Sequence, residues 1–170
     1  QIVNHYQAPD IPECDFANLL QRLEGVSGLV RIRFASPHPR HVSARMIEAI
    51  ERLPKVCKHL HLPVQSGSTR VLSLMRRRHT RERYLALIND VRARVPGVSL
   101  STDVIVGFPG ETVDDFEDTL SLVAEVRYHN IFSFKYSERP QTLASQRMSE
   151  TVEEDEKSRR LTQLQSLQKD

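Results

Sequence analysis

Short apolar runs alternate with amphipathic stretches along this chain, and that alternation restricts the possible fold more than any other feature of the sequence. Strand-like runs cover residues 1–6, 29–35, 59–64, 99–106 and 130–136. In the stretches between them, apolar residues recur three and four positions apart, as on one face of a helix. Because several of the runs are apolar on both faces, they predict a mostly parallel sheet covered by helices, which is an α/β fold.

The amphipathic stretches predict helices near residues 16–23, 46–53, 71–75, 84–95 and 116–126. Thr112 with Asp115, and Thr151 with Glu154, fit the capping box that opens a helix. The strand-like runs begin roughly 30 to 40 residues apart, the length of one strand and its following helix. In such folds a ligand binds at the carboxyl ends of the strands, so the loops there are the place to look for function.

Composition excludes some classes of protein. The chain has 170 residues, 39% of them hydrophobic and 27% charged, which is typical of a globular domain or part of one. No apolar run approaches the roughly 18 residues of a membrane span, so no membrane partner is expected. Cys14 and Cys57 lie far apart with no C-x-x-C spacing, so neither disulfides nor zinc is indicated. Free thiols of this kind are typical of a cytoplasmic protein.

Polar loops rich in glycine and proline follow four of the predicted strands. They read SPHP at 36–39, PVQSGS at 63–68, GFPGET at 107–112 and YSERP at 136–140. Parallel strands bring their carboxyl ends to one rim, so these loops are expected to lie together. Glycine at a strand exit serves a tight turn or lets backbone approach a ligand, and its recurrence favours a binding site.

Three longer motifs carry a resemblance to a known family. HLHLPVQSGS at 59–68, STDVIVGFPGET at 101–112 and FSFKYSERP at 132–140 resemble, in order and spacing, motifs of the radical S-adenosylmethionine methylthiotransferases, especially the tRNA-modifying MiaB type. The resemblance extends from residue 1 to about residue 168. It implies a partial (β/α)6 TIM-like barrel in which parallel strands alternate with helices.

The same resemblance implies family features that these residues lack. The family holds a [4Fe–4S] cluster on a C-x-x-x-C-x-x-C loop after its first strand, and no such motif occurs here. We therefore expect residues 1–149 to form a barrel segment without that strand and loop. Residues 150–170 are expected to form a helix leading toward an RNA-binding domain. Two scattered cysteines cannot ligate such a cluster, so this segment alone is expected to bind no metal and to be inactive.

The resemblance also implies that the rim binds S-adenosylmethionine. The expected cofactor-binding residues are Gln65, Ser66, Ser68, Ser101, Asp103, Gly107 and Tyr136. Some of them have a structural alternative: Ser68 would equally cap a helix that begins at Thr69, and the turn alone would explain Gly107, though less well than it explains Gly110. An aspartate within a strand is unfavourable unless it is paired, which favours a functional role for Asp103. No catalytic residue is assigned.

One dense basic cluster lies in the sequence MRRRHTRER at 75–83. Arg76, Arg77, Arg78 and Arg81 are expected to contact the phosphates of a tRNA anticodon stem-loop, as the resemblance implies. The alternative for such a run is a solvated helix face. An unpaired sheet edge in a half-open barrel also predicts self-association.

The implied activity is methylthiolation of a tRNA adenosine next to the anticodon. QIVNHY at 1–6 is similar to a segment of the tRNA enzymes, whereas HLPVQSG at 61–67 differs from the sister branch, which modifies an aspartate of a ribosomal protein. That sister activity and a non-catalytic nucleotide- or RNA-binding role remain the alternatives. A phosphate-binding barrel is disfavoured because Glu111, Asp114 and Asp115 crowd the GFPGET loop with negative charge.

Overall fold

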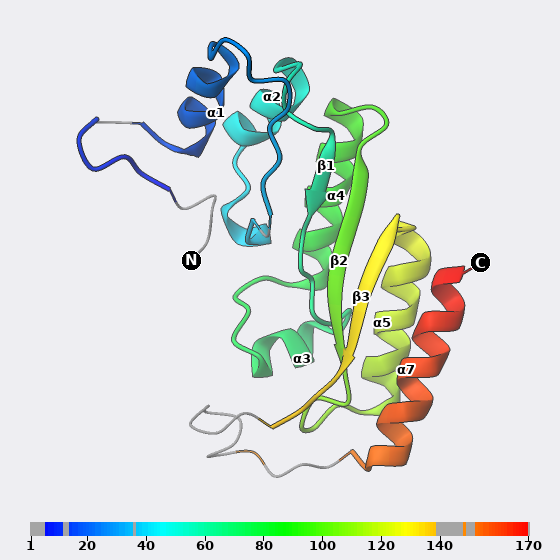
Figure 1. The fold of residues 1–170 in the computed structure, drawn as a ribbon. Coiled ribbons are helices and arrows are strands. Elements are labelled where there is room, and N and C mark those ends of the chain that lie inside the picture. The colour runs from blue at the N-terminus through cyan, green and yellow to red at the C-terminus, as the bar shows by residue number, and fades with distance from the viewer. Residues whose placement is uncertain (1–5, 12–13, 36, 139–147, 149–151, 170) are drawn as a thin grey trace. The chain divides into compact units, whose positions relative to one another are not determined.

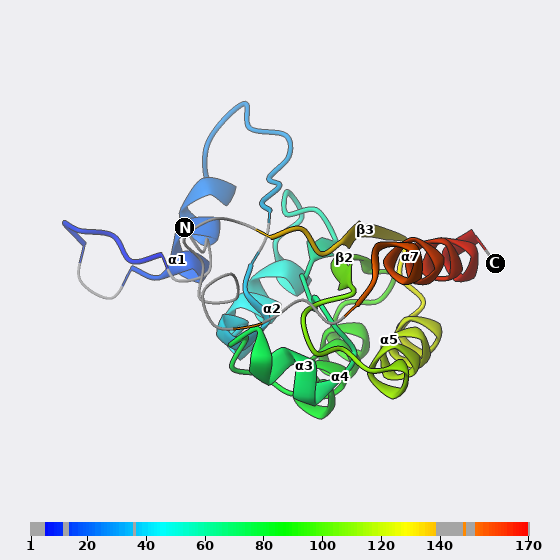
Figure 2. The same cartoon turned by 90° about the horizontal axis from the view of Figure 1, so that it is seen from below.

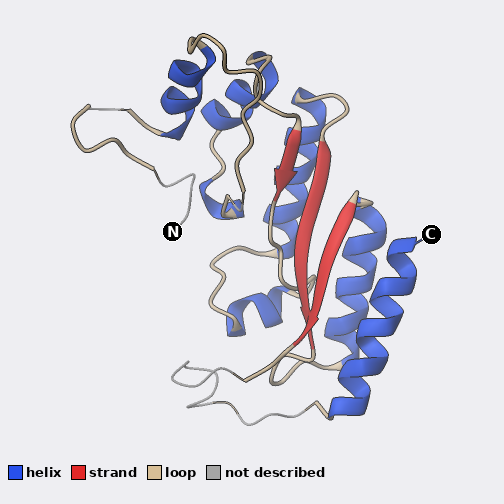
Figure 3. Ribbon diagram, viewed as in Figure 1, coloured by secondary structure: helices blue, strands red, loops and turns tan. Residues whose placement is uncertain are grey.

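The computed structural model describes residues 6–11, 14–35, 37–138, 148 and 152–169, and its elements follow the predicted alternation of helices and strands (Figure 1). In chain order they are α1 (Phe16–Glu24), the 3-10 helix η2 (Pro39–His41), α2 (Ala44–Arg52), β1 (His59–His61), α3 (Thr69–Leu74), α4 (Arg81–Arg94), β2 (Ser99–Val106), α5 (Val113–Val126), β3 (Asn130–Lys135) and α7 (Glu154–Lys169). The three parallel strands form an open sheet in the order β1-β2-β3 (Figure 3). The predicted α/β class is confirmed.

The chain divides into two compact units. The first contains residues 1–63 and 86–101, and the second contains residues 64–85 and 102–170. Both β2 and α4 therefore contribute residues to each unit. The predicted boundary between residues 149 and 150 is a separate matter and stays a prediction.

In the first unit, β1 pairs with the start of β2 in parallel register, with His59 opposite Ser99 and His61 opposite Ser101. Helices α1 and α2 pack against each other. Asp15 caps α1 and Ser43 caps α2 by accepting backbone N–H groups, which satisfies donors that a helix start leaves unpaired. The largest fully buried side chains of this unit are Leu20, Met46, Ile47, Ile50, Leu60, Leu62, Ile88 and Leu100.

The strand predicted at 29–35 is wrong. Only Ile32 pairs, in an isolated parallel bridge with Val56. Ile32 is buried, but Arg31 and Arg33 are exposed and Val30 is 84% exposed, so this run lacks the two covered faces that its apolar content suggested. Residues 1–5 of the first predicted strand lie outside the described residues, as does Thr151 of the second capping box.

In the second unit, β2 continues to Val106, and α5 and α7 lie side by side in both views (Figures 1 and 2). Helix α7 packs on β3 and on α5. The capping box predicted at the start of α5 is confirmed, because Thr112 and Asp115 exchange side-chain and backbone hydrogen bonds. On β3 Ile131 is buried, whereas Phe132 and Phe134 alternate with it and are about half exposed.

Candidate functional site

The turn after β2 depends on a glycine at its first position. Gly107 has φ 72°, a left-handed conformation that residues with a Cβ rarely adopt. A Cβ built on Gly107 would lie 2.4 Å from Cγ of Lys157 on α7. The Gly107 N–H donates to Oε2 of Glu111 at 2.6 Å, which closes the turn. The close approach predicted at Gly107 is therefore made by the Lys157 side chain of the same protein.

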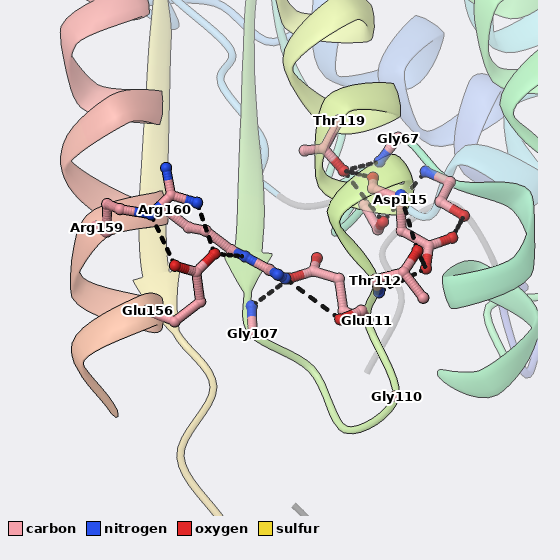
Figure 4. Close-up of polar contacts among 12 residues, drawn as sticks. Gly67, Gly107, Gly110, Glu111, Thr112, Asp115, Thr119, Glu156, Arg159 and Arg160 are labelled. Carbon is pink, nitrogen blue, oxygen red and sulfur yellow. Dashed lines mark hydrogen bonds and ion pairs between the residues drawn. The ribbon is translucent and has the colours of Figure 1, made fainter. Parts of the chain in front are cut away.

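A buried ion pair supports this turn from α7 (Figure 4). Nη1 of Arg160 lies 2.7 Å from Oε2 of Glu111, and both side chains are at most 4% exposed. Burial raises the pKa of Glu111, while the Gly107 N–H and Arg160 oppose that rise. Glu156 accepts hydrogen bonds from Arg159 and from Arg160, which lower its pKa to about 2.

Asp115, at the start of α5, accepts hydrogen bonds from two segments of the second unit, the start of α3 and the turn at Thr112. Its carboxylate accepts the Ser68 hydroxyl at 2.6 Å and the Thr112 N–H and hydroxyl at 2.8 and 2.7 Å, and it pairs with Arg70. Burial alone would raise the pKa of Asp115, but the hydrogen bonds from Arg70, Ser68 and Thr112 hold it well below its usual range. Of the three acids that were expected to crowd this loop, Glu111 and Asp115 are each paired with an arginine, and Asp114 is exposed.

The loop after β1 packs tightly on α5. The Gly67 N–H donates to the hydroxyl of Thr119 at 2.9 Å, and a Cβ on Gly67 would lie 2.5 Å from the Asp118 carbonyl oxygen. The Ser66 hydroxyl is buried and lies 3.3 Å from that of Thr119. The Ser68 hydroxyl caps α3, as its structural alternative predicted. Both hydroxyls therefore make contacts within the protein.

The main chain of Gln65 pairs with β2 beside Asp103. The Gln65 N–H donates to the Asp103 carbonyl at 2.9 Å, and the Gln65 carbonyl accepts from Ile105 at 2.9 Å. Gln65 has φ 75°, unusual for a residue with a side chain. Burial lowers the pKa of Arg77, and the negative charge of Asp103 opposes this. Arg77 is thus half-buried near a predicted cofactor residue instead of lying on a solvated face.

Tyr136 follows β3, and its N–H donates to the Val106 carbonyl at 2.8 Å. Its ring meets that of Phe108 edge-on, with centroids 5.1 Å apart, and Nζ of Lys157 lies 5.8 Å from the Tyr136 ring centroid. Burial raises the pKa of the Tyr136 phenol. The ring borders a pocket of about 560 Å³, which Ser133, Phe134, Lys135, Ser137, Glu138, Glu154, Lys157 and Leu161 also line.

Ser101 belongs to the first unit, whereas the other six predicted cofactor residues belong to the second. Its hydroxyl lies 2.9 Å from Nδ1 of His61 and 3.2 Å from Nε2 of His59. The two histidines of β1 and Ser101 of β2 therefore form a polar trio on one face of the paired strands. The pairing explains why both histidines alternate with leucines along β1.

The four predicted RNA-binding arginines differ in what they contact. Arg76 and Arg78 are exposed, and both have left-handed backbone conformations at the end of α3. Arg81 donates to the Asp118 carbonyl at 2.5 Å and pairs with Glu125 at 3.4 Å, so it holds α5 in place. Only Arg76 and Arg78 of the four present their side chains openly to solvent.

Sequence reasoning missed Arg70, Lys157 and Arg160, which complete the site in the second unit. Arg160 lies 49 positions after its partner Glu111, and no local pattern links such distant residues. Within the residues that the structure describes, no group of three or more His, Cys, Asp or Glu side chains could hold a metal ion. Among the helices of these described segments, none is long and apolar enough to cross a bilayer.

Comparison with known proteins supports the family that the three motifs suggested. The family model of the radical SAM superfamily matches residues 9–123. A tRNA-2-methylthio-N(6)-dimethylallyladenosine synthase of Moorella thermoacetica is 49% identical over 168 residues, which are 98% of this chain and 38% of that relative. The synthase of the same name from Sulfurimonas denitrificans is 48% identical over 170 residues, 98% of this chain and 39% of that relative.

Among solved structures, the chain is similar to coproporphyrinogen III oxidase (HemN) of Escherichia coli, described as a radical SAM enzyme. The TM-score is 0.64 and the identity is 25%, over 77% of this chain and 30% of that one. The chain spans somewhat more than a third of the length of the two synthases above. The expected resemblance to the methylthiotransferases is confirmed, and the chain belongs to the radical SAM superfamily.

Proposed function

We propose that this chain is the S-adenosylmethionine-binding part of a tRNA methylthiotransferase, which adds a methylthio group to an adenosine next to the anticodon. The observation that carries the proposal is 49% identity, over 98% of this chain, to a relative named tRNA-2-methylthio-N(6)-dimethylallyladenosine synthase. A protein that acts on tRNA would work in the cytoplasm.

The second unit offers groups that fit S-adenosylmethionine. The stem of Lys157 fills the space beside Gly107, so this turn would contact the cofactor through its main chain. Asp103 supplies a half-buried carboxylate suited to the cofactor's ammonium group. Tyr136 and the half-exposed Phe134 offer aromatic faces suited to adenine. When bound, S-adenosylmethionine supplies the reactive group of the superfamily's chemistry. The residues named here would bind and orient it.

The described residues do not fit an iron–sulfur cluster. Such a cluster needs several thiolates close together, and Cys14 and Cys57 belong to no group of ligands among those residues. We therefore assign the [4Fe–4S] clusters of such enzymes to residues other than those described here. We propose that this segment alone is inactive.

We propose that Arg76 and Arg78 contact tRNA phosphates, since both are exposed. Arg77 would act differently, because its guanidinium is half-buried and feels the charge of Asp103. Reversing the charge at Arg76 and Arg78 should weaken binding of the anticodon stem-loop and reduce the salt dependence of that binding.

The proposal is tested in the full-length protein by two measurements. The first is mass spectrometry of nucleosides from treated tRNA, with ribosomal protein as the competing substrate. A methylthio group on an adenosine supports the proposal, and one on an aspartate points to the sister activity. No product on either substrate, together with retained RNA binding, would favour the non-catalytic alternative.

The second measurement is S-adenosylmethionine affinity. Asp103→Ala is expected to weaken binding about tenfold, because a charge-assisted contact to the cofactor is lost. Asp114→Ala is the matched control, since Asp114 is an exposed acid on the first turn of α5. Equal affinities of the Asp103→Ala variant and the wild type would show that Asp103 is structural.

A further inference from the structure

We infer that Arg160, on α7, is a positioning residue for the turn at Gly107 and that it acts through Glu111. The inference rests on the proposed function in one respect, since that function makes the turn part of the S-adenosylmethionine site. Helix α7 lies outside residues 9–123, the part of the chain that the superfamily model matches. A helix beyond that matched region would thus set the geometry of the site.

The Arg160 guanidinium is fixed from several sides within the second unit. Nη1 donates to the Glu111 carboxylate at 2.7 Å and to the Glu111 main-chain carbonyl at 3.3 Å. Nε donates to Glu156 at 2.8 Å, and the guanidinium lies 5.4 Å from the ring centroid of Phe116. An arginine fork held in this way has little rotational freedom, so it fixes its partner as well.

One carboxylate oxygen joins α7 to the turn. Oε2 of Glu111 accepts both from Arg160 and from the Gly107 N–H, and the latter bond is 2.6 Å long. Glycine is the residue with the widest backbone freedom, so the turn has little stiffness of its own at Gly107. Its conformation depends on where the carboxylate is held, and Arg160 holds the carboxylate.

Lys157, one turn earlier on α7, reinforces the same end of β2. Its aliphatic stem occupies the space that a Cβ on Gly107 would need. Arg159, by contrast, has a side chain that is 60% exposed and pairs with Glu156 on the same helix. The helix therefore offers a matched pair of neighbouring arginines, of which one reaches the turn and one does not.

The test compares Arg160→Met with Arg159→Met in the full-length protein. The first readout is S-adenosylmethionine affinity by equilibrium dialysis. The second is hydrogen exchange of the Gly107 amide, measured against the amide of buried Leu122 in α5. For Arg160→Met we expect about tenfold weaker binding of S-adenosylmethionine than in the wild type. We also expect the substitution to speed hydrogen exchange at Gly107 about tenfold more than it speeds exchange at Leu122. Arg159→Met should change neither quantity.

Arg160→Lys should be intermediate, because an ammonium keeps the charge but lacks the planar fork. A merely structural role would instead speed exchange equally at Gly107 and Leu122, and that result would overturn the inference. Unchanged affinity and exchange in Arg160→Met would overturn it too. If Arg160→Met does not fold, the neutral pair Glu111→Gln with Arg160→Met carries the same test, since replacing both partners leaves no unpaired charge.

Failure of the proposed function would look different. If the wild-type protein binds no S-adenosylmethionine, the proposed function is wrong. A faster exchange at Gly107 but not at Leu122 in Arg160→Met would still show that Arg160 positions the turn. If the wild type binds the cofactor and Asp103→Ala weakens binding while Arg160→Met does not, the function stands and the inference falls.

Discussion

Glu111 and Asp115 stand at opposite ends of one short segment of the second unit, and each is paired with an arginine, yet their surroundings differ. The Glu111 side chain is fully buried and that of its partner Arg160 is 4% exposed. Asp115 is nearly as buried, but its partner Arg70 is 51% exposed. Burial is the largest influence on both carboxyls: it raises the pKa of Glu111, whereas at Asp115 the hydrogen bonds from Arg70, Ser68 and Thr112 together outweigh it and lower the pKa.

The number of donors explains the difference. The Glu111 carboxylate receives the Gly107 N–H and Arg160 through a single oxygen, and among the described residues its other oxygen has no hydrogen-bond partner. The Asp115 carboxylate receives Ser68, Thr112 and Arg70 through both oxygens. Hydrogen-bond donors to both oxygens stabilise the charged form of a buried carboxylate, as at Asp115. Glu111 has donors to one oxygen only, so its charged form depends more strongly on each of them.

The largest expected effect comes from removing Glu111 alone. Glu111→Leu leaves the Arg160 guanidinium buried without its main partner, which should lower the free energy of unfolding by about 3–5 kcal/mol. Urea unfolding measures this loss. The double variant Glu111→Leu with Arg160→Met should recover most of it, because no unpaired charge remains. A loss below about 1 kcal/mol in the single variant would contradict the contrast with Asp115.

Asp115→Asn should cost about 2 kcal/mol at pH 7, since it weakens several hydrogen bonds to a charged group. The pKa of Asp115 is lower in the folded state, so its stabilisation is present above the unfolded value of roughly 3.9 and is lost as the pH falls below it. The difference between Asp115→Asn and the wild type should therefore shrink from pH 7 to pH 3.

Glu111 should show the opposite trend, which sharpens the comparison. Its pKa is raised in the folded state, so its contribution to stability is greatest below the unfolded pKa and declines as the pH rises through the folded one. Glu111→Gln should remove that decline. Parallel pH trends for Glu111→Gln and Asp115→Asn would show that the two carboxylates are alike after all.

The smallest effect is expected at Glu156, which is 30% exposed. Arg159 and Arg160 lower its pKa from 4.5 to about 2, so its stabilisation is lost as the pH falls through that interval. Solvent screens the attraction between Glu156 and the two arginines, so Glu156→Gln should lower the free energy of unfolding by less than about 1 kcal/mol at pH 7. Added salt should shrink the cost further, as thermal unfolding at low and high ionic strength would show.

Periodicity was sufficient to predict most of the fold. The five predicted amphipathic stretches correspond to α1, α2, α3, α4 and α5, and the strand predicted at 99–106 is β2 itself. The run at 29–35 is also apolar, but the strand predicted there is wrong. Its error is instructive, because a strand also needs a neighbour, and only Ile32 finds one.

Part of the site was also predictable from local pattern. A glycine immediately after an apolar strand indicated a special backbone conformation, and Gly107 has one. Asp115 was identified through its capping motif with Thr112. The roles of Arg70 and Arg160 were not predictable, since each reaches its carboxylate from a helix 45 or more positions away. Sequence patterns report the geometry of one element and not the contacts between elements.

The salt bridge between α7 and the turn has a practical consequence for anyone who shortens this protein. A recombinant domain that ends at residue 123, where the superfamily match stops, would keep Glu111 but discard its counter-ion. Such a truncated product would also lose the last residues of α5 and the packing of α7 on that helix, so we expect it to express poorly or to aggregate. Expression boundaries for related proteins are better drawn beyond the helix that supplies the arginine.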